Sequence, residues 1–446
     1  MTGPARLGAA AEAGPGSPRG LRVVLDARPL QEPERAPLTA AYLEGLLGAF
    51  DAEPLAGESF ALLLRSDLDD PTTRFERLEV IGRRLLPPTH LLRSASLSVD
   101  PFVLSGASLG AAWRAEAGGA AGAVYHAVGG AVPLAIRIPV VVTLLDLAPW
   151  ELPKAYQRTV TGRVGQTLRG RLLRDAAAVI VGSETVAASA RRLLRLRRER
   201  VHVVPFAPRP AFRFWPAADG SGKTEPGSGA SRRSARGRAE ASDRSERERL
   251  GLPSRYLVYA GRYDARQDLA TLLRALALLT AAGRPDGLPD DVPWPPRVLL
   301  VGASPGDRAS LARAASRVDV GDALAYAPGL SDERVAGLVR GARAAILPAL
   351  SDATGLAALE AVACGTPVIA SAVGALPEAI GTAGILVAPR EPERLAAALA
   401  TAWADDRVHA RLVASARERA EAGLRTWADV AAETRAIYAG VGIRPG

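Results

Sequence analysis

The sequence predicts an α/β protein built from two Rossmann-like lobes that face each other across a cleft. Short apolar runs alternate with helical segments along both halves of the 446-residue chain, which is the rhythm of parallel strands joined by helices. A polar, low-complexity segment at residues 217–249 separates the two halves. A chain of this length has room for two or three domains, so we expect one lobe on either side of that segment.

The first lobe, residues 21–216, opens with a strand at residues 21–26, where LRVVLD is a short apolar run. The preceding residues 1–20 are rich in Ala, Gly and Pro and predict a flexible tail. After a loop with three prolines, Thr39 is expected to cap a helix that ends at Phe50. The other strands of this lobe are expected at residues 60–64, 124–126, 139–145, 177–181 and 201–205.

Two segments of the first lobe are rich in arginine. Residues 156–174 predict an amphipathic helix, and Ser183 is expected to cap a second helix that leads into RRLLRLRRER at residues 191–200. The expected apolar face of the first helix consists of Val160, Val164, Leu168 and Leu172. Such basic faces are typical of solvated helices, and contact with an anionic membrane surface is the alternative.

The second lobe, residues 250–425, repeats the same alternation of strands and helices. The expected strands lie at residues 256–260, 298–301, 324–327, 344–347, 367–370 and 385–387. The expected helices lie at residues 269–280, 356–363, 393–403 and 408–420, and Ser331 is expected to cap one more. A last helix near residues 427–438, within the segment 426–446, is expected to pack back towards the first lobe. Because residues 217–249 carry few apolar side chains, they predict a disordered insertion.

Residue totals exclude several classes of protein. Cys364 is the single cysteine, which excludes a disulfide framework, and the four histidines lack metal-ligand spacing, so we expect no metal site. The carboxylates at residues 67–70 (DLDD) are more typical of a turn. The net charge of +9 gathers at residues 191–200 and 217–250 without interleaved aromatic residues, which argues against nucleic-acid binding. No signal peptide is visible, and the expected compartment is the cytoplasm, with peripheral contact at the inner membrane face as the alternative.

Residues 346–378 carry the first candidate site. They predict a strand, a loop, a buried helix and a second strand, which together form a βαβ crossover over a parallel sheet. The loop lies at the carboxyl edge of the sheet, where ligands of doubly wound sheets bind. The backbone N–H groups of Thr354, Gly355 and Leu356 would begin the helix there and attract an anion.

Two carboxylates flank the start of this helix. Asp352 stands just before it, and Glu360 follows eight residues later, a little over two helical turns, so that both fall roughly on one side. A functional pair is one interpretation. The alternative is that Asp352 only caps the helix and Glu360 is a partly exposed helix residue.

A second candidate site is GRYDARQ at residues 261–267, between an expected strand and an expected helix. Arg262 and Arg266 could pair with a diphosphate, because guanidinium groups match phosphate oxygens; the alternative is two solvated loop arginines. Asp146 follows the strand at residues 139–145 and would face the expected cleft. A turn aspartate is the alternative interpretation of Asp146.

Taken together, these residues resemble the retaining glycosyltransferases of family 4, which have the GT-B fold. The resemblance runs from Arg22 to Tyr438 without the insertion and is strongest in residues 256–387. There, a strand followed by GR and a helix precedes LPALSDATGLAALEAVACGTPVIAS and VGALPEAIGTAGILV, in the order of the family's donor domain.

The resemblance implies that a sugar passes with retention, and without a metal or other cofactor, from a nucleotide-diphosphate sugar to the hydroxyl of a glycan, lipid or small-molecule acceptor. Asp352 and Glu360 take the two positions of the family's E-x7-E motif, the first facing the donor sugar and the second the ribose hydroxyls. Asp352 and Asp146 are then the candidate catalytic residues. The candidate donor-binding residues are Gly261, Arg262, Arg266, Gln267, Thr354, Gly355, Leu356 and Glu360.

Four positions depart from the family pattern. Gln267 stands where the family usually has Lys, Leu145 where it often has His, and Asp352 where it has the longer Glu. Residues 35–38 replace a Gly-rich loop after the first strand. These departures support a second hypothesis, a degenerate family member that binds a nucleotide sugar or a partner without efficient turnover. The sugar, the base, the acceptor and the oligomeric state are not encoded in these motifs.

Overall fold

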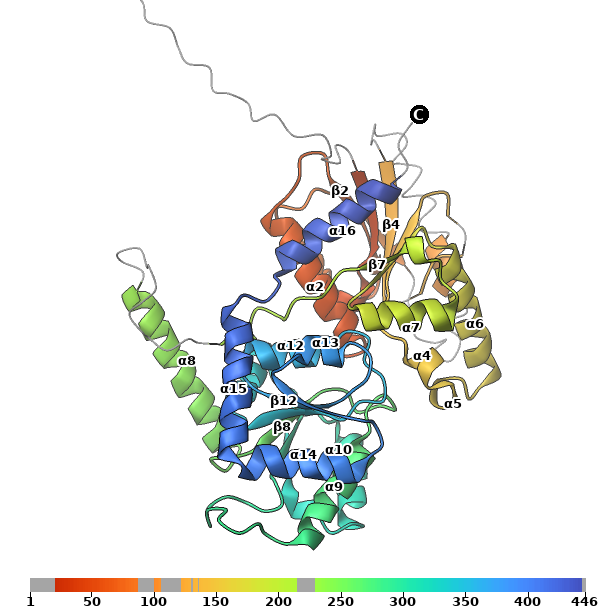
Figure 1. Ribbon diagram of the computed structural model, residues 1–446. Coiled ribbons are helices and arrows are strands. Elements are labelled where there is room, and N and C mark those ends of the chain that lie inside the picture. Colours follow the sequence, from red (N-terminus) through yellow and green to blue (C-terminus); the bar gives the residue numbers. More distant parts are fainter. Residues whose placement is uncertain are drawn as a thin grey trace, which may run out of the picture. The chain divides into compact units, whose positions relative to one another are not determined.

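The computed structural model describes residues 21–86, 100–105, 122–129, 131–134, 136–214 and 229–442 (Figure 1). The expected tail at residues 1–20 lies outside these ranges. The chain forms two compact units. The first consists of Met1–Thr143, Leu168–Val179 and Ala431–Gly446, and the second of Leu144–Thr167 and Ile180–Val430.

The first sheet has seven strands in the order β3-β2-β1-β4-β5-β6-β7. Its strands are β1 Leu21–Asp26, β2 Ser59–Arg65, β3 Val80–Leu86, β4 Gly122–Val128, β5 Val140–Thr143, β6 Ala178–Val181 and β7 Val201–Val203. β1 pairs in parallel with both β2 and β4, so the chain winds outwards from a central strand. β3 was not predicted, because this edge strand exposes most of its side chains and lacks a continuous apolar run.

The helices of the first half correct two expectations. The expected loop at residues 28–38 contains α1 (Arg28–Gln31) and the start of α2 (Pro37–Ala52), so Thr39 is not the helix cap. Proline suits the first helical position because its missing N–H would have no partner there. The segment after Asp146 contains α4 (Ala148–Glu151). The remaining helical elements here are η1 Pro71–Arg74, α5 Pro153–Tyr156, α6 Val160–Asp175, α7 Glu184–Leu194 and η3 Arg198–Arg200.

The apolar face predicted for the first arginine-rich helix is partly wrong. α6 begins at Val160, and Val160 and Val164 are exposed by 66% and 55%. Gln166 and Arg169 are buried instead, and Arg169 Nη2 donates to the carbonyl oxygen of Gly129 at 2.8 Å. The Arg169 guanidinium is buried because it donates to a backbone oxygen, and the spacing of apolar residues along the helix does not predict such a contact. By contrast, Ser183 caps α7 as predicted, through a hydrogen bond from the Val186 N–H.

A buried polar network in the first unit joins β4 and β5 to the last helix, α16 (Trp427–Val441). Tyr438 Oη lies 2.6 Å from Nδ1 of His126, and Nε2 of His126 lies 2.8 Å from Oγ1 of Thr143. The Thr143 hydroxyl donates to Tyr42, so its oxygen accepts from His126, and Nδ1 accepts from Tyr438. This arrangement requires a neutral imidazole, and burial lowers the pKa of His126 to about 3.

The stability of the first unit is therefore expected to fall as the pH is lowered from about 6.5 towards 3. In this range the unfolded chain protonates His126 and the folded protein does not, so each pH unit removes up to about 1.4 kcal/mol from the free energy of unfolding. Urea unfolding across this range checks the slope. The His126→Gln variant, which cannot titrate, should show a shallower dependence; an unchanged slope would contradict the assignment.

The second sheet has six strands in the order β10-β9-β8-β11-β12-β13. They are β8 Leu257–Ala260, β9 Val298–Val301, β10 Leu324–Ala327, β11 Ala344–Leu347, β12 Val368–Ser371 and β13 Gly384–Val387, and the recorded pairs are parallel. The helices are α9 Leu269–Ala282, α10 Pro305–Ser316, η4 Gly321–Ala323, α11 Asp332–Arg340, α12 Leu356–Ala363, α13 Leu376–Ile380, α14 Pro392–Ala404 and α15 Asp406–Glu421.

Helices cover both faces of the second sheet (Figure 1). Val258 points into a core shared with α11, α12 and α13, whereas its neighbours Leu257 and Tyr259 point into a core shared with α9 and α14. This alternation is what a parallel sheet buried on both sides requires. The predicted α/β architecture with two Rossmann-like sheets is thereby confirmed.

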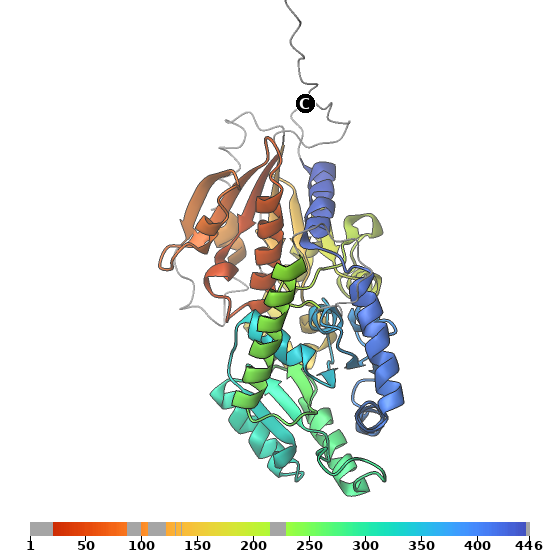
Figure 2. The ribbon, with the colours of Figure 1, turned by 90° about the vertical axis from the view of Figure 1, so that its left-hand side faces the viewer.

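The expectation of disorder at residues 217–249 is wrong for its described part. Residues 229–249 form the helix α8 (Gly229–Arg249), which packs along α11 (Figure 2). Asp243 of α8 pairs with Arg340 at 3.0 Å, and Glu246 pairs with Arg334. Arg, Ala and Glu favour helices intrinsically, and these ion pairs replace the apolar contacts that the composition lacks. Residues 217–228 lie outside the described ranges. Within those ranges, no helix combines the length and hydropathy that crossing a bilayer needs.

Candidate functional site

The predicted βαβ unit is present at residues 346–378, where β11 leads through a loop into α12 and then into β12. β11 and β12 pair in parallel, so the loop before α12 lies at the carboxyl edge of the second sheet, as expected. Gly355 is the residue before the helix, and Thr354 and Leu356 are buried on either side of it.

The Asp352 carboxylate accepts hydrogen bonds from the backbone N–H groups of this loop. Its Oδ1 accepts hydrogen bonds from the backbone N–H of Thr354 at 2.9 Å and of Gly355 at 2.7 Å. The Leu356 N–H lies 3.4 Å from the Thr354 hydroxyl oxygen. Burial raises the pKa of Asp352, and the two N–H donors oppose that rise. The carboxylate thus stands where a bound anion would accept the same hydrogen bonds.

Gly374 holds the Asp352 loop from behind. Its φ is +54°, and a Cβ atom there would lie 1.8 Å from the backbone oxygen of Asp352. The Ala375 N–H donates to this same oxygen at 2.9 Å. The close approach of the two backbones therefore requires glycine at this position.

The Gly374→Ala variant is expected to unfold with a free energy about 2 kcal/mol lower than that of Gly302→Ala. Gly302 has a similar positive φ of +77°, but a Cβ there meets nothing within 4 Å, so it measures the backbone strain alone. Chemical denaturation of both variants gives the difference. Equal losses of unfolding free energy in the two variants would mean that the Asp352 loop moves away from the added Cβ atom without an energetic penalty.

Glu360 is buried and paired, not partly exposed. Arg209, which follows β7 in the chain, donates Nε and Nη2 to its two carboxylate oxygens at 2.5 and 2.9 Å. Burial raises the pKa of Glu360, and Arg209 opposes the rise. Arg209 also pairs with Asp332 at the start of α11. Sequence reasoning missed Arg209, because nothing in its local sequence distinguishes it from other loop arginines.

The loop at residues 261–267 is built around a carboxylate that was not predicted. Asp264 accepts from Arg262 Nε at 2.9 Å and from Arg266 Nε at 3.0 Å. Burial opposes ionisation of this carboxyl, but the hydrogen bonds from both arginines hold its pKa well below the ordinary value. Asp264 lies two residues from each arginine in the sequence, and this spacing could have predicted that it pairs with both. Gly261 packs against the Tyr259 ring, where a Cβ would come within 2.9 Å.

The structure brings two of the predicted residues together within the second unit. Arg266 Nη1 lies 2.9 Å from Asp146 Oδ2, so the aspartate after β5 is an ion-pair partner and not a simple turn residue. Asp146 also accepts from the Ala148 N–H at 2.8 Å, in the turn that leads into α4. Arg266 is largely enclosed, whereas the Arg262 side chain stays 38% exposed and is the more accessible guanidinium.

Backbone hydrogen bonds hold the two candidate loops beside each other. The Leu350 N–H donates to the Arg266 carbonyl oxygen, and the Asp268 N–H donates to the Pro348 carbonyl oxygen, both at 2.6 Å. Gln267 forms a β-bridge with Ala349. Its side-chain Oε1 is buried and accepts no hydrogen bond from the described residues.

One further carboxylate near this edge was missed. Glu151 at the end of α4 accepts a hydrogen bond from the hydroxyl of Ser351, the residue before Asp352. Burial raises the pKa of Glu151, and the Ser351 hydroxyl opposes the rise. Leu145, where the family often has His, is buried. Asp146 and Glu151 are thus the polar side chains that this segment brings to the edge of the sheet.

Known proteins share this sequence pattern. Residues 242–419, which contain every predicted donor-binding residue and the end of α8, match the family described as glycosyl transferases group 1. The chain is 37% identical over 195 residues to the D-inositol 3-phosphate glycosyltransferase of Streptomyces griseus, covering 42% of this chain and 38% of that protein. For the Streptomyces relatives, the matched part is less than half of their length.

A longer match is to the D-inositol 3-phosphate glycosyltransferase of Xylanimonas cellulosilytica, with 30% identity over 314 residues, covering 65% of this chain and 67% of that protein. Among solved structures, Anabaena HepE in complex with UDP-glucose matches with a TM-score of 0.60 at 16% identity, covering 92% and 97% of the two chains. At this identity, the likeness shows the shared fold. The chain therefore belongs to the family of glycosyl transferases group 1, which is of the family 4 type, and it has the GT-B fold.

Proposed function

We propose that this protein transfers a sugar, with retention and without a metal, from a nucleotide-diphosphate sugar to an acceptor hydroxyl. The observation that carries the proposal is the backbone link between the loops at residues 261–267 and 348–355, which holds the loop that carries Arg262 and Arg266 beside the loop that leads into α12. Guanidinium forks and helix N-termini are the groups that bind phosphate in proteins. The names of the relatives and the UDP-glucose held by HepE support a nucleotide-sugar donor.

In this proposal, Arg262 binds the diphosphate through the part of its guanidinium that Asp264 does not engage. The leaving diphosphate gains charge as the glycosidic bond breaks, so fixed donors stabilise the transition state more than the ground state. The N–H groups of Thr354 and Gly355 are the second set of donors. They become available when a phosphate oxygen replaces the Asp352 carboxylate, which then turns towards the donor sugar.

Glu360 takes the ribose hydroxyls in this proposal, with Arg209 orienting its carboxylate. Each carboxylate oxygen can accept a second hydrogen bond beside the one from Arg209. The buried, unpartnered Oε1 of Gln267 adds an acceptor close to the same loops. The acceptor belongs to the class of glycans, lipids or small molecules that carry a free hydroxyl. A lipid acceptor would fit peripheral membrane contact through the arginines at residues 191–200.

A hydrolysis and transfer assay with a panel of UDP-, GDP- and ADP-sugars tests this function. We expect turnover with sugars of one nucleotide, an unchanged anomeric configuration by NMR and no loss of rate in EDTA. Nucleotide binding without turnover of any donor would favour the second candidate, a binding protein of degenerate family type. Two observations support that candidate. The Asp352 carboxylate accepts the hydrogen bonds of the backbone N–H groups that a phosphate would need, and Leu145 and Gln267 differ from the residues usual in the family.

Glu360→Ala tests the ribose contact separately. The variant is expected to bind the nucleotide about 10- to 100-fold more weakly, because hydrogen bonds to a charged group contribute about 1.5–3 kcal/mol. Asp332→Ala is the control, since Asp332 also pairs with Arg209 but is not assigned to the ribose. Calorimetric titration measures both. Unchanged affinity in a folded Glu360→Ala protein would overturn the assignment.

A further inference from the structure

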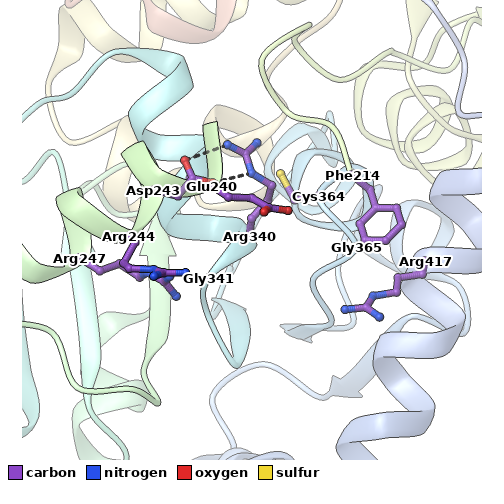
Figure 3. A pocket seen from close by; sticks show the side chains of 11 residues that line it. Phe214, Glu240, Asp243, Arg244, Arg247, Arg340, Gly341, Cys364, Gly365 and Arg417 are labelled. Carbon is purple, nitrogen blue, oxygen red and sulfur yellow. Dashed lines mark hydrogen bonds and ion pairs between the residues drawn. The ribbon is translucent and has the colours of Figure 1, made fainter. Parts of the chain in front are cut away.

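A cavity of about 350 Å³ lies in the second unit (Figure 3). Its walls come from α8, the end of α11, the turn after α12, and α15. This volume is within the range of small-molecule sites in proteins. Nothing in the proposed transfer reaction uses these walls.

The cavity lies at the opposite edge of the second sheet from the candidate donor site. Gly341 in its wall leads into β11, and Gly365 leads into β12, so both mark the amino ends of strands. The loops that carry Arg262 and Asp352 follow the carboxyl ends of β8 and β11. In a parallel sheet these two edges are separated by the length of the strands.

Four arginines and two carboxylates line the cavity. Arg244 and Arg247 come from α8, Arg340 from α11 and Arg417 from α15; the carboxylates are Glu240 and Asp243 of α8. Figure 3 shows Arg244 and Arg247 on one side and Arg417 on the other, with the Asp243–Arg340 ion pair between them. The walls therefore carry an excess of positive charge that converges on one hollow.

Three of these guanidinium groups form no ion pair within the part of the chain that the structure describes. Arg340 pairs with Asp243 at 3.0 and 3.2 Å. Arg417 instead stacks over the Phe214 ring at 5.2 Å, and among the described residues no carboxylate forms an ion pair with Arg244, Arg247 or Arg417. Arg244 and Arg417 are exposed and Arg247 is half-buried, so all three guanidinium groups remain accessible to an anion in the cavity.

From this geometry we infer that the cavity is a binding site for a small phosphate-type anion, separate from the donor site. Guanidinium forks from two helices can each take a pair of phosphate oxygens, while the Phe214 ring keeps the Arg417 fork oriented. Its volume exceeds that of a free phosphate ion, so a phosphorylated small molecule is the class of ligand that fits. The inference does not depend on the proposed transfer activity.

Calorimetric titration of the full-length protein with inorganic pyrophosphate tests the site. We expect saturable binding that weakens by about tenfold or more in Arg244→Gln/Arg417→Gln, since two charge-assisted contacts are lost. Arg262→Gln should retain this binding, because Arg262 belongs to the other edge of the sheet. Arg238→Gln, an exposed position on the same helix outside the cavity wall, is the matched control and should bind as the wild type does.

The inference would be overturned by the absence of saturable binding to the wild type or by loss of pyrophosphate binding in Arg262→Gln alone. Equal weakening in Arg238→Gln and in the double variant would also overturn it, because it would indicate non-specific attraction. Melting curves without ligand verify that each variant is folded. Arg247→Gln is a second variant within the cavity, and unchanged affinity in it and in the folded double variant would equally exclude the site.

Discussion

Replacing Arg262 by glutamine is expected to lower kcat/KM for the nucleotide-sugar donor by about 100- to 1000-fold. Removing one fixed donor that stabilises developing negative charge typically has an effect of this size. Arg262 is the more exposed of the two loop arginines, and it is bound on one side only, by Asp264. Steady-state kinetics with the donor identified by the panel measure the change.

Two variants calibrate the Arg262 result. Arg262→Lys keeps the charge but loses the planar fork, so it should recover only part of the rate. Arg274→Gln removes an exposed arginine from α9, the helix that follows the loop, and should leave kcat/KM unchanged. The role would be refuted if Arg262→Gln and Arg274→Gln had the same kcat/KM. A change confined to KM would instead indicate equal binding of ground state and transition state.

Replacing Arg209 by alanine is expected to lower the free energy of unfolding by about 3 kcal/mol. Glu360 is 5% exposed, and Arg209 is the partner that supplies both of its close ion-pair contacts. Loss of one member of a buried pair leaves the other charge without compensation, which is much more costly than replacing both. Urea unfolding measures the change.

The double variant Arg209→Met/Glu360→Leu is expected to recover much of that loss, because neither charge remains buried. Asp332→Asn is the control, since its partly exposed carboxylate is a minor partner of Arg209 and should contribute less than about 1 kcal/mol. If the double variant lost as much free energy of unfolding as Arg209→Met and Glu360→Leu lose together, the interaction energy between the two side chains would be zero. The stabilisation would then come from packing of the Arg209 side chain over Phe212.

The sequence by itself determined the architecture of the second half closely. Residues 298–301, 324–327, 344–347 and 356–363 were predicted with the bounds that the structure gives. Strands of a parallel sheet that is covered on both faces are apolar along their whole length, so short runs bounded by glycine or polar residues locate them. The family membership also followed from local motifs on this half. The roles of Arg262, Asp352 and Glu360 stay predictions until the variants are measured.

In the first half, local hydrophobic patterns failed to predict some of the elements. β3 is an exposed edge strand, and α6 buries Gln166 and Arg169 while Val160 and Val164 remain in solvent. Hydrophobic periodicity assumes that apolar side chains point inwards. These elements break that assumption, because the buried Arg169 guanidinium finds a backbone acceptor in Gly129 and the side chains of the edge strand β3 stay in water.

Only the tertiary structure decided how the charged residues are paired. Arg209 and Glu360 are 151 positions apart, and Arg266 and Asp146 are 120 apart, so no local spacing relates them. α8 depends in the same way on ion pairs with α11, which its composition alone does not reveal. A buried strand is recognisable from its own sequence, because its apolar side chains must be removed from water. An ion pair depends on a distant partner that only the folded chain brings within reach.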